Sequence, residues 1–179
     1  LEELLGYYTT LTSGETPVHR PVDRYEDYIR FTEGQDKTAQ EAYWRHYLSG
    51  LEEGSLLPFI RSTADRNKEV VAFRAIEWIL DGEKSSQVSE YVQRHHLTDN
   101  TLIQGIWAYL LHRYTDKSRV VFGVIVSGRP EDLAEVEGRV GLYINMLPLT
   151  TDIQEERRVA EWLSQLQQED QESRQYQYV

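Results

Sequence analysis

Two adjacent histidines, His95 and His96, followed by Asp99, are the residues in this sequence that most suggest catalysis. An imidazole titrates near neutral pH, so a histidine pair beside a carboxylate is a candidate general base. The same residues also lie between two segments with helical spacing, where Thr98 or Asp99 suits the N-cap of a helix starting near Thr101. We therefore expect the two histidines to be loop and capping residues.

Other catalytic and metal sites are also incomplete in the sequence. Adjacent side chains such as His95 and His96 point apart, and no third ligand is arranged with them, so the pair does not predict a zinc site. The chain has 0 cysteines, which excludes disulfides, thiolate catalysis and cysteine-based zinc sites. It also lacks a Gly-x-Ser-x-Gly turn, a Walker-type loop and a Gly-x-Gly-x-x-Gly sequence. The residue types alone therefore complete no catalytic set.

Composition narrows the class of protein. The 179 residues suit one domain or a large part of one, and the 11% of aromatic residues argue against disorder. A net charge of −11 disfavours nucleic-acid binding, which needs a surplus of Lys and Arg. No stretch reaches the ~20 apolar residues that a membrane span requires, and the first residues are acidic, unlike a signal peptide. We expect a soluble, acidic, cytoplasmic protein.

The elements that would position any site follow an α/β or α+β order. Apolar residues at helical spacing predict helices, and alternating or continuous β-branched runs predict strands, with Gly50 ending one helix. The 69–81 strand has apolar residues on both faces and is expected to be central in its sheet. The helices are expected at 1–13, 37–49, 84–95, 101–114 and from near Glu155, with a short helix or turn at 22–34. The strands are expected at 69–81, 119–126 and 140–149.

One polar residue stands out in an apolar run. Residues 140–148 read VGLYINMLP, so Asn145 lies among apolar neighbours. A buried amide must find hydrogen-bond partners, because leaving it unpaired costs about 1–3 kcal/mol. Asn145 is thus expected either to pin backbone or to face a polar cavity, and spacing favours the structural role.

Five ordered motifs resemble the condensation domains of nonribosomal peptide synthetases. Three departures from the family pattern are Phe31 for Trp, Tyr143 for Phe and Met146 for Thr. The motifs are YEDYIRF at 25–31, YWRHYLSG at 43–50, LTDNTLIQGIWAYLL at 97–111, VVFGVIVSGRP at 120–130 and VGLYINMLP at 140–148.

The resemblance implies a fold related to chloramphenicol acetyltransferase, with two lobes and a reaction tunnel between them. Residues 1–179 would be the C-terminal, acceptor-side lobe, a central mixed sheet flanked by helices. An upstream carrier-bound acyl or peptidyl thioester would be attacked by a downstream aminoacyl amine, as in secondary-metabolite synthesis. The chain would bind no cofactor directly and would meet the 4'-phosphopantetheine arms of carrier domains. Its partners would be the N-terminal lobe, two peptidyl carrier domains and an adjacent adenylation domain.

The resemblance also implies roles for individual residues. Asn145, Gly141 and Tyr143 would face the tunnel. Asp27 and Tyr28 would be packing and hydrogen-bonding residues, and Arg129 would make a structural ion pair. The full structural set is Tyr25, Asp27, Tyr28, Trp44, Ser127, Gly128, Arg129 and Pro130.

The ends of the sequence complete these expectations. Neither end has a cap or linker, so we expect a segment of a longer polypeptide, cut within a two-lobed domain. The family's His-His-x-x-x-Asp-Gly motif would lie just upstream of Leu1, and this chain alone would carry no catalytic residue and be inactive. Two alternatives remain: an epimerisation-type relative, or a non-catalytic carrier-docking or scaffold module of the same fold.

Overall fold

The computed structural model describes residues 2–17, 25–51, 53–59 and 75–178. The chain divides into two compact units. Unit 1 comprises Leu1–Gly34 and Pro130–Leu142, and unit 2 comprises Gln35–Arg129 and Tyr143–Val179. Residues 130–142 are therefore an excursion from the middle of unit 2 that packs with the N-terminal part of the chain.

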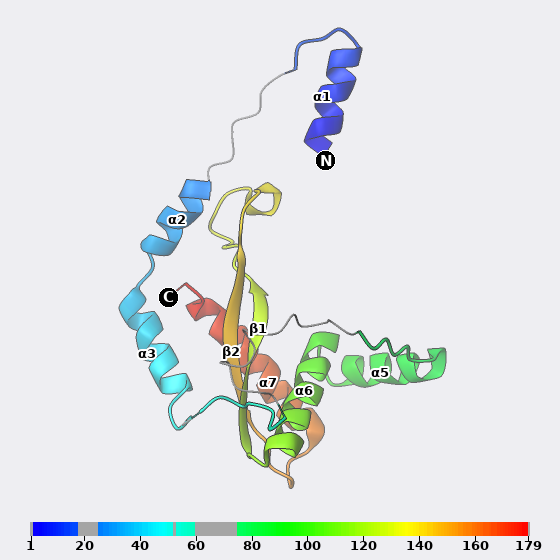
Figure 1. Ribbon diagram of the computed structural model, residues 1–179, viewed down its shortest axis with the longest axis vertical. Helices are drawn as coiled ribbons and strands as arrows, with labels where there is room; N and C mark the ends of the chain where they lie inside the picture. Colours follow the sequence, from blue (N-terminus) through cyan, green and yellow to red (C-terminus); the bar gives the residue numbers. More distant parts are fainter. Residues whose placement is uncertain (1, 18–24, 52, 60–74, 179) are drawn as a thin grey trace. The chain divides into compact units, whose positions relative to one another are not determined.

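Unit 2 is built on a β-hairpin. β1 (Arg119–Ser127) pairs antiparallel with β2 (Ile144–Asp152), in a register that matches Arg119 with Asp152 and Ser127 with Ile144 (Figure 1). Valine and isoleucine dominate β1, as expected for a pleated, half-buried surface. In β1, Val120, Val124 and Val126 are buried on the face toward the core. In β2, the consecutive residues Leu149, Thr150 and Thr151 are all buried, so near Thr150 both faces of the sheet are covered.

Three helices pack either against this sheet or against another helix that does. They are α5 (Gly82–Arg94), α6 (Asp99–Thr115) and α7 (Val159–Ser173). α6 contacts β1, and α7 contacts both α6 and β2. A Cβ on Gly105 of α6 would meet Leu163 Cδ2 at 2.2 Å, so the glycine permits the close approach of the two helices. The apolar core contains Val92, Leu97, Val124, Val126, Leu147, Leu149, Leu163 and Leu166.

Helix α3 (Lys37–Tyr47) is fixed at both ends. Asp36 caps its N-terminus by accepting from the amides of Thr38 and Ala39. The chain turns away through Gly50, whose φ of 79° suits glycine. The Arg119 guanidinium donates to the carbonyls of Tyr47 and Ser49, at 3.1 and 2.8 Å. The Arg119 guanidinium thus provides donors for the carbonyls at the C-terminus of α3 and connects this helix to the first residue of β1.

Unit 1 contains α1 (Glu2–Thr12), α2 (Tyr25–Glu33) and the short helix η1 (Val136–Gly138). Polar contacts join α2 to the excursion. Tyr25 donates its hydroxyl to the Leu142 carbonyl at 2.7 Å, and Arg139 pairs with Asp27 at 3.1 Å. These contacts connect segments more than 100 residues apart in sequence, with separations of 117 and 112.

The mixed α and β class and most expected elements are confirmed. Helices lie at the five places where they were expected, and the 22–34 segment, expected as a short helix or turn, contains the helix α2. Thr98 caps α6 by accepting from the Thr101 amide at 3.1 Å. The last helix begins at Val159, four residues later than Glu155. Within the described residues the sheet is a two-stranded antiparallel hairpin, and none of the described helices is long and apolar enough to cross a membrane.

Two strand predictions need correction. The second strand begins at Ile144 and ends at Asp152, instead of spanning 140–149. Pro130 has no amide hydrogen, so the ladder cannot continue beyond the bond from the Gly128 amide to the Tyr143 carbonyl. In the 69–81 segment, residues 75–81 belong to no strand and Ile76 is 96% exposed. Residues 69–74 lie outside the described part of the chain.

Candidate functional site

Asn145 uses both ends of its amide to hold backbone. Its Oδ1 accepts from the Met146 amide at 2.8 Å, and its Nδ2 donates to the Gln177 carbonyl at 2.5 Å. The side chain therefore links β2 to the segment that follows α7. These bonds correspond to the first of the two roles that the sequence left open for Asn145, the pinning of backbone.

Asn145 also lines an open pocket of 520 Å³ between α3, β2 and the residues after α7. Trp44 and Leu48 come from α3 and its C-terminus, Met146 and Pro148 come from β2, and Gln177 closes one end. The lining is mainly apolar, with amides from Asn145 and Gln177 and the ion pair of Glu41 with Arg45 as its polar groups. Small-molecule sites commonly combine an apolar wall with few polar groups in this way.

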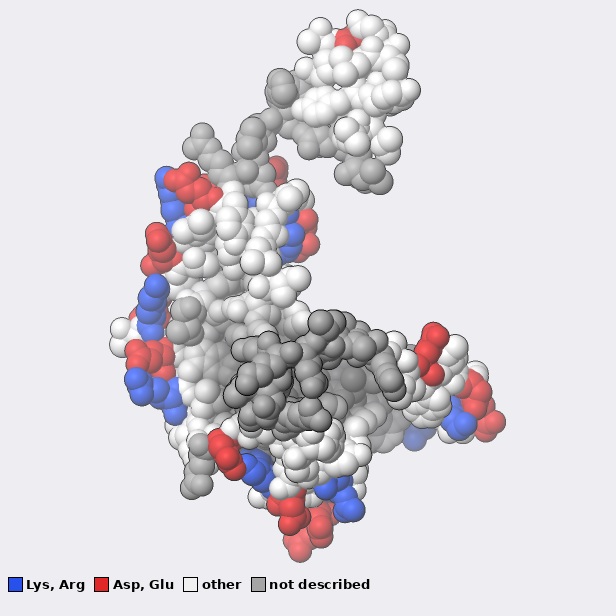
Figure 2. Space-filling view, in the orientation of Figure 1, with Lys and Arg blue, Asp and Glu red and all other residues white. Residues whose placement is uncertain are grey.

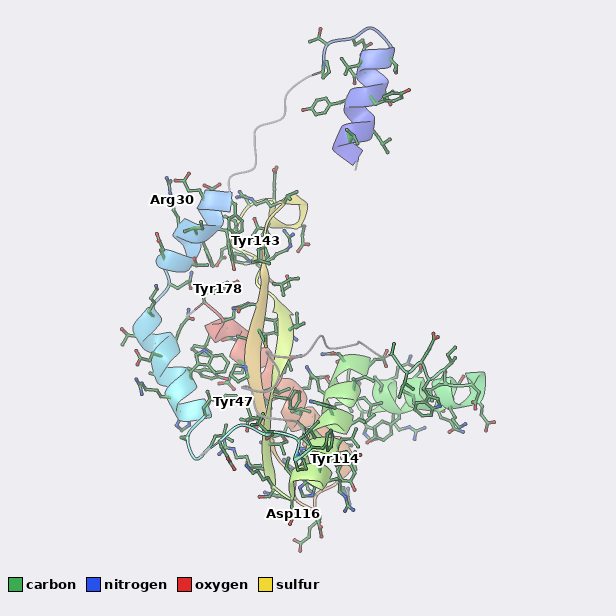
Figure 3. The ribbon with its side chains drawn as sticks, viewed as in Figure 1. Arg30, Tyr47, Tyr114, Asp116, Tyr143 and Tyr178 are labelled. Atoms are coloured by element: carbon green, nitrogen blue, oxygen red, sulfur yellow. The ribbon has the colours of Figure 1, made fainter. Side chains whose placement is uncertain are left out.

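Three consecutive residues after α7 are each held by a different element. They are Tyr176, which ends the short helix η2 (Arg174–Tyr176), and the next two residues, Gln177 and Tyr178. The Trp44 indole donates to the Tyr176 carbonyl at 2.7 Å. Tyr178, which is labelled in Figure 3, donates its hydroxyl to the Gly128 carbonyl at 3.4 Å. Asn145 holds Gln177 between them. α3, β2 and the end of β1 thus converge on residues 176–178.

A stacked aromatic pair strengthens the hold of α3 on this segment. The rings of Tyr43 and Tyr176 lie 3.9 Å apart with an interplanar angle of 6°. Burial raises the pKa of Tyr43 well above its usual range, and the nearby Tyr47 hydroxyl adds to the effect. Tyr43 is therefore a neutral packing residue throughout the physiological pH range.

The outer edge of β2 is closed as well. Thr150 donates its amide to the Tyr47 hydroxyl at 3.1 Å, and the same hydroxyl donates to the Thr150 carbonyl at 3.4 Å. Burial raises the pKa of Tyr47 to about 12, although the bond from the Thr150 amide opposes the rise. Pro148 has no amide hydrogen, and Asn145 occupies the amide of Met146. Each outward amide position from Met146 to Thr150 is therefore satisfied or lacks a hydrogen.

Tyr143 lies directly before β2 and is 3% exposed. The Arg129 guanidinium lies over its ring, 4.2 Å from the centroid, a cation–π arrangement. Gly128 donates its amide to the Tyr143 carbonyl at 2.6 Å, and Ser127, which is exposed, pairs with Ile144. The ion pair expected for Arg129 and the tunnel role expected for Tyr143 stay predictions.

The remaining expected site residues belong to unit 1. Tyr25 and Asp27 make the polar contacts with residues 130–142, and the Tyr25 and Tyr28 rings lie 5.4 Å apart. Gly141 is exposed and Pro130 is buried. The structure therefore brings Trp44 and Asn145 into one pocket and places the Tyr-x-Asp-Tyr motif elsewhere, within the other unit.

Sequence reasoning missed three contributors to these contacts: Tyr47, Arg139 and Gln177. Tyr47 enters the sequence analysis only as part of the 43–50 motif, and its hydroxyl role depends on the neighbouring strand edge. Gln177 contributes through its backbone carbonyl, which no residue type can signal. Arg139 could have been suspected as a single cation in an otherwise acidic loop.

The histidine pair has the loop role that the sequence predicted. His95 is the C-cap of α5 and lies against the Tyr91 ring at 4.6 Å, while His96 has a φ of 54°. His95 also borders an open cavity of 690 Å³ along α7, where burial raises the pKa of Glu169. Within the described part of the chain, no three His, Asp or Glu residues cluster in a way that could hold a metal ion.

Charged residues are mixed on the helix surfaces. Figure 2 shows acidic and basic side chains interspersed along α2 and α3. Two i,i+4 ion pairs account for part of this pattern: Glu26 with Arg30, and Glu41 with Arg45 at 2.6 Å. Exposed pairs of this kind contribute only about 0.3–0.5 kcal/mol each, so they add little to the stability of either helix.

Comparison with known proteins gives one consistent result. A family model for the condensation domain matches residues 1–179. A linear gramicidin synthase protein from Brevibacillus parabrevis is 38% identical over 177 residues, covering 99% of this chain and 4% of that protein. The X-domain from teicoplanin biosynthesis aligns with a TM-score of 0.74 at 25% identity, covering 98% of this chain and 40% of the other.

The first condensation domain of the CDA synthetase has the same fold. It aligns with a TM-score of 0.64 at 20% identity, covering 95% of this chain and 38% of the other. The chain thus spans a small fraction of the curated relative and about two fifths of the solved domains.

Proposed function

Because the chain belongs to the condensation-domain family, we propose that it is the C-terminal, acceptor-side lobe of a domain that forms peptide bonds in nonribosomal peptide synthesis. The observation that carries the proposal is the family match over residues 1–179, together with five motifs in the family's order. The coverage of 38–40% of the solved structures supports a single lobe.

The proposed reaction joins two substrates held on carrier domains. The amine of the downstream aminoacyl group attacks the upstream thioester carbonyl, so a C–N bond forms and the C–S bond breaks. The upstream phosphopantetheine thiol leaves, and the proton lost by the amine is taken up as that thiolate is protonated. The product is a peptide one residue longer on the downstream carrier. The histidine motif for proton transfer is proposed to lie in the other lobe, and this chain alone is proposed to be inactive.

The proposed contribution of this lobe is positioning. A thioester is already activated, and well-oriented reactants gain effective molarities of about 10⁵ M or more. We assign the tunnel-facing role to Asn145, Tyr143 and Gly141. The pocket beside Asn145 supports the assignment for this residue, because it offers an apolar wall with two amides and one ion pair.

Exposed apolar side chains support the N-terminal lobe as a partner. One face of α1 presents Leu4, Leu5, Tyr8 and Leu11, which are 55–68% exposed. In unit 2, the outer face of α6 presents Ile103, Ile106, Trp107 and Leu110, which are 40–63% exposed. A helix that is apolar on opposite faces is typical of an element covered on both sides. The carrier domains and an adenylation domain are proposed as further partners, with the carriers bringing the phosphopantetheine arms.

The test is a reconstitution of the complete domain. The chain is expressed joined to its upstream lobe, supplied with two loaded carrier domains, and assayed by mass spectrometry for the dipeptidyl carrier. Product from the joined lobes and none from the 179-residue chain is the expected result. Exchange of the α-hydrogen without a peptide bond would indicate an epimerisation-type relative. Carrier binding with neither reaction would indicate a docking module.

A further inference from the structure

The contacts of residues 176–178 give Asn145 a more specific role. We infer that Asn145 is a positioning residue, whose amide locks Gln177 to the edge of β2 and so shapes the pocket wall without touching the reacting atoms. We call the bond from the Asn145 amide to the Gln177 carbonyl the lock. Its effect on catalysis rests on the proposed function, whereas the bond itself is a property of this chain alone.

The amide is already engaged in two directions. Oδ1 takes the outward amide of Met146, and Nδ2 reaches the Gln177 carbonyl across 32 residues of sequence. The Nδ2 bond of 2.5 Å is short for an N–H···O contact. A side chain held between two backbone groups has little freedom to follow a substrate, so its effect on a reaction passes through the backbone that it holds.

The lock acts together with Trp44. The indole of Trp44 fixes the carbonyl of Tyr176, directly before the residue that Asn145 fixes, and both side chains line the 520 Å³ pocket. Two independent donors on consecutive carbonyls restrain one segment. Removal of either donor should therefore loosen the contact made by the other, since residues that share a partner couple energetically.

Only an amide performs both tasks at this position. Asn145→Asp keeps the volume and the acceptor for the Met146 amide, but it cannot donate to Gln177 and places a carboxylate against a carbonyl oxygen. Asn145→Ala removes both bonds. The pair of variants therefore separates the lock on Gln177 from the cap on the edge of β2.

The first experiment measures the lock in the 179-residue chain, without substrate. The Trp44 indole N–H is followed by two-dimensional NMR, with Trp44→Phe used to assign its signal. Asn145→Asp and Asn145→Ala should both shift this signal and speed its hydrogen exchange by about five- to tenfold, the loss of roughly one hydrogen bond. The matched control is Gln175→Ala, an exposed neighbour of Tyr176, which should leave the signal unchanged. An unchanged indole in both Asn145 variants that remain folded by circular dichroism would overturn the inference.

The second experiment uses the complete condensation domain. Asn145→Asp and Trp44→Phe should each raise the KM for the acceptor carrier substrate by about five- to tenfold with a smaller change in kcat, and the double variant should lose less than the product of the two. If Asn145 contacts the reacting atoms instead, Asn145→Asp will lower kcat and Trp44→Phe will leave both constants at wild-type values. A wild-type domain that makes no peptide would refute the proposed function, and the indole measurement would still decide the lock.

Discussion

Helix α2 of unit 1 and the core of unit 2 differ in the contacts that the structure describes for them. Unit 2 has a continuous apolar core in which Leu149, Leu163 and Leu166 are 0–1% exposed. In unit 1, none of the nine described residues of α2 is buried, and the helix is joined to residues 130–142 through Tyr25 and Asp27. The contacts described between α2 and residues 130–142 are thus polar, whereas unit 2 is packed around an apolar core.

The difference predicts how each unit responds to mutation and solvent. Burying a leucine side chain contributes about 1.5–3 kcal/mol, whereas a partly exposed ion pair contributes about 0–1 kcal/mol and weakens with salt. Asp27 is 42% exposed in its pair with Arg139, so this pair belongs in the weaker class. The stability of unit 2 should therefore change little with salt and fall when a core side chain is truncated. The contact between α2 and residues 130–142 in unit 1 should weaken as the salt concentration rises.

The largest effect is expected from Leu166→Ala in α7. Leu166 is 0% exposed, so its truncation leaves a cavity and should lower the free energy of unfolding of unit 2 by about 2–5 kcal/mol. Urea unfolding followed by circular dichroism measures the loss. Ser164→Ala, an exposed position on the same helix, should change stability by less than about 0.5 kcal/mol. Equal losses at both positions would contradict a packed core.

Gly105→Ala tests the close approach of α6 and α7. The new methyl group would overlap Leu163, which is 1% exposed and has little room to move, so a loss of about 1–3 kcal/mol is expected despite the better helix propensity of alanine. Thermal unfolding measures the change. Gly82→Ala, where a Cβ meets nothing within 4 Å, is the control and should be nearly neutral. A stabilised Gly105→Ala protein would show that the helices can separate at little cost.

Alkaline pH should weaken unit 2 through Tyr47. In an unfolded chain its phenol ionises near the ordinary pKa of 10.0, whereas burial raises the pKa to about 12 in the folded protein. Stability that is complete below pH 10 should therefore fall as the pH rises from 10 to 12, by about 1 kcal/mol after allowance for partial exposure. Urea unfolding at several pH values measures the slope. Tyr47→Phe should be less stable at pH 7 and should lose this part of the slope.

The smallest effect is expected in unit 1. Asp27→Ala removes the partner of Arg139 and should speed hydrogen exchange of residues 130–142 by a factor of about two to five, corresponding to less than 1 kcal/mol. Wild-type protein in 1 M salt should approach the same exchange rate, because salt screens the pair. Glu26→Ala, which breaks only an exposed pair with Arg30, is the control. Exchange that ignores both Asp27→Ala and salt would show that apolar contacts hold unit 1 too.

The sequence predicted those features that depend on neighbouring residues. The cap at Thr98, the stop at Gly50 and the places of the five expected helices follow from short-range spacing. The start of β2 at Ile144 could not be read locally, because it depends on Pro130 interrupting the partner side of the hairpin. Alternating apolar residues likewise predicted a strand at 69–81, but a strand also needs a neighbouring edge, and residues 75–81 are not paired with one.

The candidate site was predicted only in part for the same reason. Asn145 was singled out correctly as an amide that needs partners, but its partner is a backbone carbonyl 32 residues away. Trp44 and Tyr176 lie 132 residues apart. Contacts with backbone groups at such separations leave no pattern in one sequence, so the bonds of Asn145 and its place in the pocket wall emerge only from the three-dimensional structure.

The contacts of residues 130–142 have a consequence for recombination between related condensation domains. In this segment, Arg139 and the Leu142 carbonyl are complemented by Asp27 and Tyr25, which the chain supplies 112 and 117 positions earlier. A chimera with a single crossover between these segments would inherit a carboxylate and phenol from one parent and their counterparts from another. Breakpoints that transfer both segments together should therefore give more functional hybrids than breakpoints placed between them.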